Sequence, residues 1–110
     1  MTRIAQHLMG KYPNLYREGV IELGTDGWLD ILDVLSSFLV QNPDIIVTQV
    51  KEKFGSLRFY ADNTTDVEDK LIDFAEAISI KTCVGCGCSL AEFRGICKRC
   101  SGRPDYKETI

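Results

Sequence analysis

Apolar residues recur at helical spacing in three segments of the chain and alternate with polar residues in a fourth. Residues 2–11 predict a short helix that Thr2 caps and that ends before Pro13. Residues 28–41 predict a second helix, because apolar side chains return every three or four positions there. Its predicted buried stripe comprises Trp28, Ile31, Leu32, Leu35, Phe38 and Leu39.

Polar residues at two further positions mark helix starts. The turn 24–27 precedes the second helix, and its Thr25 or Asp26 is expected to cap that helix. Thr65 and Glu68 form a capping box ahead of a third helix. The predicted buried stripe of this helix comprises Val67, Leu71, Phe74, Ala75 and Ile78. Its outer face is predicted to carry Asp66, Glu68, Asp69, Asp73 and Glu76.

Residues 45–61 predict a β-hairpin. Gly55 and Ser56 fit the central positions of a type II′ turn, which would place Lys53 opposite Arg58. Side chains alternate between the two faces of a strand, so the register also sorts the residues. The predicted core face carries Val50, Phe54, Leu57, Phe59 and Ala61. The predicted outer face carries Gln49, Lys51, Lys53, Arg58 and Tyr60.

These elements predict an α+β fold, in which helices pack on a small antiparallel hairpin or sheet. A short edge strand at 20–23 is expected to extend it. The predicted organisation is an α+β body at 1–80, a zinc ribbon or knuckle at 81–102 and a flexible tail at 103–110. At 110 residues the chain can form one hydrophobic core with a small appendage.

The C-terminal region predicts a structural zinc site. Cys83 and Cys86 form one CxxC pair, and Cys97 and Cys100 form a second after ten intervening residues. Two such pairs provide four thiolates for tetrahedral zinc, with no position left for water or substrate. The metal would fold a segment that has no core of its own. An iron centre and a redox dithiol are the alternatives.

All five cysteines lie between residues 83 and 100, and their number is odd, so a metal fits better than a disulfide framework. Cys88 is the spare cysteine and is expected to be a small packing residue. The chain has no secretion signal at its start and no apolar run of about 20 residues, so a cytoplasmic protein with reduced thiols is expected.

No catalytic group stands out in the sequence. His7 is the only histidine, and it lies on the first helix without a partner that the sequence reveals. No glycine-rich phosphate loop is present either. The expectation is therefore a protein that is not an enzyme, with no membrane association and with its oligomeric state left open.

The basic outer face of the hairpin is the candidate partner-binding surface. Lys51, Lys53, Arg58 and Tyr60 would project together there. Such a face can hold an acidic protein surface or a phosphate backbone, but it can also be solvated or covered by the acidic third helix. The net charge of −3 hides a basic C-terminal region, because residues 81–110 carry six Lys or Arg against three Asp or Glu. Taken alone, this balance would indicate a nucleic-acid-binding tail, but four thiolates with one zinc ion add a charge of −2 and largely remove that indication.

The hairpin string KEKFGSLRFY, residues 51–60, resembles a KEKFGxLRFY segment shared by small proteins that bacteriophages and prophages encode. In those proteins a Gly-Asp-Gly-Trp-like turn precedes the segment, as at 24–28 here, and a CxxC pair follows the next helix. The resemblance extends from about Pro13 to Cys100, and Cys88 is not part of the family pattern. It implies a phage origin and no particular biochemical activity.

The resemblance shapes the functional expectation. We expect a non-catalytic, zinc-stabilised phage accessory protein that binds a protein or protein complex in the cytoplasm of a bacterial host. Inhibition of a host defence system such as CRISPR–Cas is one form that this binding can take. The alternative is a nucleic-acid-binding accessory protein that uses the basic hairpin face and the zinc ribbon.

Overall fold

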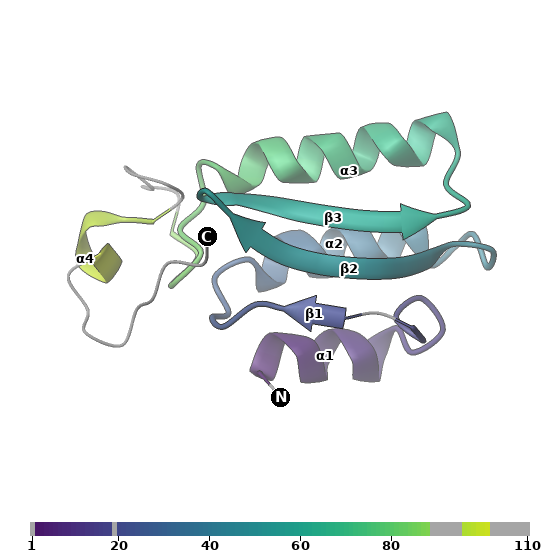
Figure 1. Ribbon diagram of the computed structural model, residues 1–110, viewed down its shortest axis with the longest axis horizontal. Helices are drawn as coiled ribbons and strands as arrows, with labels where there is room; N and C mark the ends of the chain where they lie inside the picture. Colours follow the sequence, from purple (N-terminus) through teal and green to yellow (C-terminus); the bar gives the residue numbers. More distant parts are fainter. Residues whose placement is uncertain (1, 19, 89–95, 102–110) are drawn as a thin grey trace.

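The computed structural model describes residues 2–18, 20–88 and 96–101, and Figure 1 shows their arrangement. The predicted flexible tail at 103–110 lies outside the described residues. The described chain forms a three-stranded sheet of order β1-β2-β3. Strand β1 (Val20–Glu22) pairs in parallel with β2 (Ile46–Lys53), which pairs antiparallel with β3 (Ser56–Asp62). The α+β prediction is confirmed, and the edge strand predicted at 20–23 is present.

The hairpin turn differs by one residue from its prediction. Lys53 pairs with Ser56 and Lys51 with Arg58, so the central residues of the turn are Phe54 and Gly55. Both have positive φ angles, 55° and 81°, as a type I′ turn requires. The predicted pairing of Lys53 with Arg58 is therefore wrong.

The buried carboxylate of Glu52 explains the register. It accepts a hydrogen bond of 2.8 Å from the Gly55 N–H, which stabilises the turn from the core side. Val50, Leu57 and Phe59 are buried as predicted, but Phe54 lies at the tip of the hairpin and is 54% exposed. Its assignment to the core is wrong.

Helices α2 (Leu29–Leu39) and α3 (Asp66–Ser79) pack on one face of the sheet, and α1 (Arg3–Lys11) lies against α2. Trp28, Leu32, Leu35 and Leu39 are buried as predicted, and Ile31 is partly buried. Phe38, however, is 52% exposed, so its assignment to the buried stripe of the second helix is wrong.

Helix α3 is rotated from its predicted orientation. Ile72, Ala75 and Ser79 are its buried residues, whereas Val67, Phe74 and Ile78 are exposed. The edge of β3 supplies the reason. The Leu57 N–H donates to Ser79 Oγ at 2.9 Å and the Phe59 N–H donates to the Glu76 carboxylate at 3.0 Å. Polar side chains of α3 thus accept hydrogen bonds from the N–H groups at the free edge of β3. Glu76 faces the sheet, so its assignment to the outer face of the third helix is wrong.

The predicted caps had mixed outcomes. Thr2 accepts a hydrogen bond from the Ala5 N–H, and the capping box of Thr65 and Glu68 is complete, so these two predictions are confirmed. Helix α2 has no side-chain cap. Asp26 instead accepts from the Ile4 N–H at the start of α1, so the cap predicted for α2 is wrong.

Among the described residues, no helix has the length and apolar character needed to cross a membrane.

Candidate functional site

The first CxxC pair lies on a tight turn after α3. The Cys83 N–H donates to the Cys88 carbonyl oxygen at 2.9 Å, and the Gly87 N–H donates to the Cys83 carbonyl oxygen at 2.8 Å. Gly87 has a φ of 84°, and a Cβ there would lie 2.8 Å from the Gly27 carbonyl oxygen. A glycine at position 87 therefore allows both the left-handed backbone and the close approach of the 24–27 turn.

The 24–28 segment holds this cysteine turn against the body of the protein. The Val84 carbonyl oxygen accepts hydrogen bonds from the Gly27 N–H at 2.9 Å and from Thr25 Oγ1 at 2.6 Å. The Trp28 indole donates to the Thr82 carbonyl oxygen at 2.9 Å. The sequence indicated only a turn before a helix at 24–28. In the structure this segment is also where the cysteine turn contacts the body of the protein. The division into a body at 1–80 and a zinc ribbon or knuckle at 81–102 stays a prediction.

Four sulfur atoms form a compact group that can hold a metal ion. The Sγ atoms of Cys83, Cys86, Cys88 and Cys97 all lie within 4.8 Å of one another. Cys86 Sγ and Cys97 Sγ are 3.8 Å apart, and all five cysteines are free thiols. Cys97 and Cys100 are brought to the group by the short helix α4 (Lys98–Ser101) and the residue before it.

Cys100 lies beside the same group. The thiols of Cys97, Cys83 and Cys86 are close enough to contribute to the raised pKa of its own thiol. A Cβ on Gly85 would lie 3.0 Å from Cys100 Sγ and 3.6 Å from Cys83 Sγ, which places both sulfurs against this glycine. The four predicted ligands are therefore close together, but the structure also brings the predicted spare, Cys88, into ligand range. Cys88 and Cys100 are alternatives for the fourth position.

Backbone donors favour the thiolate form of two cysteines. The N–H of Cys88 is the main cause that lowers the pKa of the Cys86 thiol to about 6. The N–H of Cys100 likewise lowers the pKa of the Cys97 thiol. Burial is the main reason that the pKa of the Cys100 thiol is raised to about 12. Because metals bind thiolates, the N–H groups aimed at Cys86 and Cys97 prepare both for coordination.

The predicted partner-binding residues share the open face of the sheet. Lys51 is opposite Arg58, Tyr60 is opposite Gln49, and Lys53 is opposite Ser56, so Lys51, Lys53, Arg58 and Tyr60 project to the same side. No described helix covers β2 and β3 on this side (Figure 1). Lys53 and Tyr60 are exposed, and Lys51 and Arg58 are partly exposed. None of the three basic residues forms an ion pair with another described residue.

An acidic groove of about 720 Å³ continues this face beyond Tyr60. It lies between the sheet and α3, and its carboxylates come from β1, β3 and α3. These carboxylates are Glu22, Asp62, Asp69, Asp73 and Glu76. The sequence predicted the basic residues of the open face, but it did not predict that an acidic groove adjoins them. The basic residues and the acidic groove are neighbours only because α3 lies along the edge of β3.

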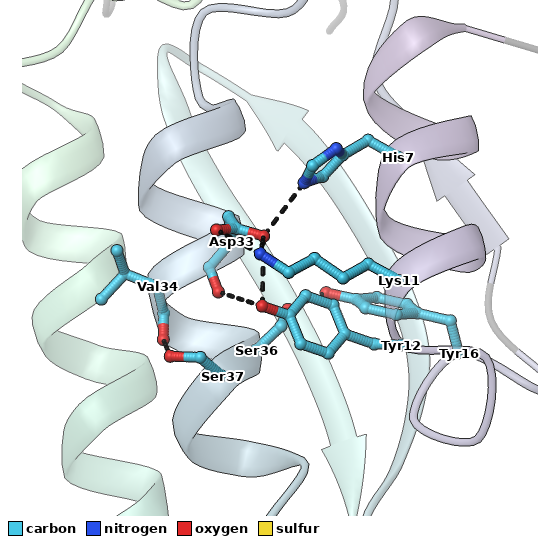
Figure 2. Close-up of polar contacts among 8 residues, drawn as sticks. All are labelled: His7, Lys11, Tyr12, Tyr16, Asp33, Val34, Ser36 and Ser37. Carbon is cyan, nitrogen blue, oxygen red and sulfur yellow. Dashed lines mark hydrogen bonds and ion pairs between the residues drawn. The ribbon is translucent and has the colours of Figure 1, made fainter.

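A second polar cluster joins α1 to α2, as Figure 2 shows. Asp33 Oδ1 lies 3.0 Å from His7 Nε2, 3.1 Å from Lys11 Nζ and 3.1 Å from the Tyr12 hydroxyl. These contacts, with that of His7 as the largest, lower the pKa of the Asp33 carboxyl. The imidazole of His7 has no other hydrogen-bond partner than Asp33 among the described residues. The cluster links the first two helices through polar side chains.

No family model matches this chain, and searches of curated proteins and of solved structures found no match.

Proposed function

We propose that this protein is a non-catalytic binding protein, stabilised by one zinc ion, that docks on another protein through the open face of its sheet. Zinc is supported by the spacing of the two CxxC pairs and by sulfur geometry. A tetrahedral site with Zn–S bonds of about 2.3 Å has its sulfur atoms about 3.8 Å apart. The distance between Cys86 Sγ and Cys97 Sγ is 3.8 Å.

The position of Tyr60 between two opposite charges carries the protein-binding proposal. Tyr60 is 48% exposed, and it shares the open face with Lys51 and Arg58 while it also lines the acidic groove. Tyrosine is among the residues that most often anchor protein interfaces, because its ring buries a large area and its hydroxyl stays polar. The surface around Tyr60 is basic on one side and acidic on the other. It fits a partner protein that places acidic residues against the basic side and basic residues against the acidic groove.

The same two-signed surface disfavours the nucleic-acid alternative. A phosphate backbone that contacted Lys51 and Arg58 would continue past Tyr60 into the carboxylates of the groove. Repulsion there opposes the attraction at the basic end, because phosphate contacts depend on an extended positive surface.

The resemblance to phage proteins directs the search for the partner. We propose that the partner is a protein of the bacterial host, such as a component of a defence system. Inhibition of that component would follow if the open face covers a surface that it needs for its own contacts.

The proposal is tested by identifying the partner and measuring its affinity for variants. Tagged, metal-loaded protein would be used to capture a partner from the bacterial host, and mass spectrometry would name it. Tyr60→Ala and the double variant Lys51→Glu, Lys53→Glu should each weaken binding of the purified partner by about tenfold or more. Both variants leave the partly buried Arg58 in place, so their melting temperatures should match that of the wild type.

Lys81→Glu is the matched control, because Lys81 is an exposed lysine outside the sheet. It should bind the partner like the wild type. Unchanged affinity in the two face variants would contradict the proposal. Salt-dependent binding of duplex DNA that is lost in the lysine variant would support the nucleic-acid alternative instead.

A further inference from the structure

The outer side of the two sheet-covering helices carries an apolar surface that the monomer leaves exposed. Phe74 is 65% exposed, and Val34, Phe38 and Ile78 are exposed beside it. A groove of about 360 Å³ runs between α2 and α3 and has an almost entirely apolar lining, with Asp30 at one end. Soluble monomers rarely expose contiguous apolar patches of several side chains, so this surface is suited to a partner.

Two charged residues stand at opposite corners of this surface. Asp30 lies four residues before Val34 on α2, and Lys70 lies four residues before Phe74 on α3, so each shares the exposed stripe of its helix. Both are exposed, and neither forms an ion pair with another described residue.

The two helices run antiparallel, which sets the corners apart. The indole of Trp28, before α2, contacts Thr82, after α3. At the other end Asn42, after α2, hydrogen-bonds Glu68 in the first turn of α3. Asp30 therefore lies at the end of the surface where α3 finishes, and Lys70 lies near the end where α3 begins.

We propose that this α2/α3 surface binds a second copy of the chain and makes the protein a homodimer. In a twofold dimer the same patch faces itself. A twofold axis that lies in the plane of this surface and passes midway between the two corners places Asp30 of each copy against Lys70 of the other. The apolar residues then meet at the centre and the two charge pairs form at the border, which is the usual arrangement of a protein interface.

The dimer is compatible with the proposed partner site and does not depend on it. Helices α2 and α3 lie on one side of the sheet, and Lys51, Arg58 and Tyr60 lie on the other. A dimer formed through the helices would therefore present two open sheet faces, one on each side of the assembly.

Sedimentation equilibrium of the full-length, metal-loaded protein over a wide concentration range tests the proposal. The wild type should form dimers as its concentration rises. Phe74→Asp should raise the dimer dissociation constant by about 30-fold or more, because it places a charge at the centre of the apolar contact. Val34→Asp makes the same change on α2, and each variant should keep the circular dichroism and zinc content of the wild type. Phe54→Asp, at the exposed hairpin tip, is the matched control and should leave the dissociation constant unchanged.

A charge exchange tests the twofold arrangement itself. Asp30→Lys and Lys70→Asp should each raise the dissociation constant several-fold, since each places like charges together at both corners. The double variant restores opposite charges and should return the constant close to that of the wild type. A wild type that stays monomeric at its highest soluble concentration, or a dimer that Phe74→Asp and Val34→Asp leave intact, would overturn the dimer. A double variant no better than the single ones would overturn the pairing of Asp30 with Lys70.

Discussion

The backbone N–H of Gly27 donates a hydrogen bond of 2.9 Å to the carbonyl oxygen of Val84, which lies between the first two cysteines. This contact couples the metal-binding turn to the start of α2. A Cβ at position 27 would lie 2.1 Å from the Cys83 carbonyl oxygen and 2.4 Å from that of Val84. Both neighbours are backbone atoms, so no flexible side chain can move aside.

Gly27→Ala should therefore destabilise the protein by roughly 1–3 kcal/mol or more, because the cysteine turn must move away from the body. Urea unfolding followed by the fluorescence of Trp28, the only tryptophan, measures the change. Gly24→Ala is the matched control, since a Cβ there meets nothing within 4 Å, and its stability should stay near that of the wild type. Equal stability of the two variants would contradict the docked arrangement.

Metal analysis of the purified protein should find one zinc ion per chain. Cys83→Ser and Cys97→Ser should each abolish tight binding and loosen the segment that carries the cysteines. Removal of the metal with a chelator should have the same effect on the wild type. Iron in place of zinc, or no metal at all, would show that the proposed cofactor is wrong.

Comparison of Cys88→Ser with Cys100→Ser decides the fourth ligand. We expect Cys100→Ser to lose the metal and Cys88→Ser to keep it, because Cys97 and Cys100 have the spacing of a second CxxC pair. The opposite result would assign the position to Cys88, whose sulfur already lies within 4.8 Å of those of Cys83, Cys86 and Cys97.

Phe54→Asn should stabilise the hairpin by about 0.5–1 kcal/mol. Asn-Gly is the preferred pair at the centre of a type I′ turn, and asparagine accepts a positive φ more readily than phenylalanine. Thermal or urea unfolding measures the gain. Phe59→Ala, by contrast, should cost roughly 3–5 kcal/mol, because Phe59 is buried. If Phe54→Asn were the strongly destabilising variant, the one-residue shift of the turn would be wrong.

Asp33 should make stability depend on acid pH. The pKa of its carboxyl is lowered in the folded state by His7 and by the other groups that it contacts. The unfolded state then binds more protons as the pH falls, so the stabilisation is present above the unfolded pKa and is lost as the pH falls through the folded pKa. Asp33→Asn should therefore destabilise the protein at neutral pH, and the difference from the wild type should shrink in acid.

Urea unfolding of both proteins at a series of pH values tests this expectation. The difference between the proteins, rather than the stability of either, isolates Asp33 from the loss of metal in acid. A difference that is constant from neutral to acid pH would rule out a contribution of the ionised Asp33 carboxylate.

The sequence by itself determined the features that depend on neighbouring residues. Helix periodicity and the capping box at Thr65 and Glu68 depend on residues a few positions apart, so they predicted the helices. The spacing within each cysteine pair is equally local, and it was enough to propose a set of metal ligands. The alternation of side chains in the hairpin likewise predicted that Lys51, Lys53, Arg58 and Tyr60 share a face. The predicted pairing was wrong by two residues, and a shift by an even number keeps each side chain on its face.

Tertiary structure decided the features that depend on distant partners. Periodicity shows that a helix has an apolar stripe, but which stripe is buried depends on what the helix packs against. In α3 the unpaired N–H groups of Leu57 and Phe59 select Ser79 and Glu76, and this rotation leaves Phe74 at the surface. The acidic groove beside Tyr60 and the docking of Gly27 on Val84 arise in the same way, because each joins segments that no local pattern relates.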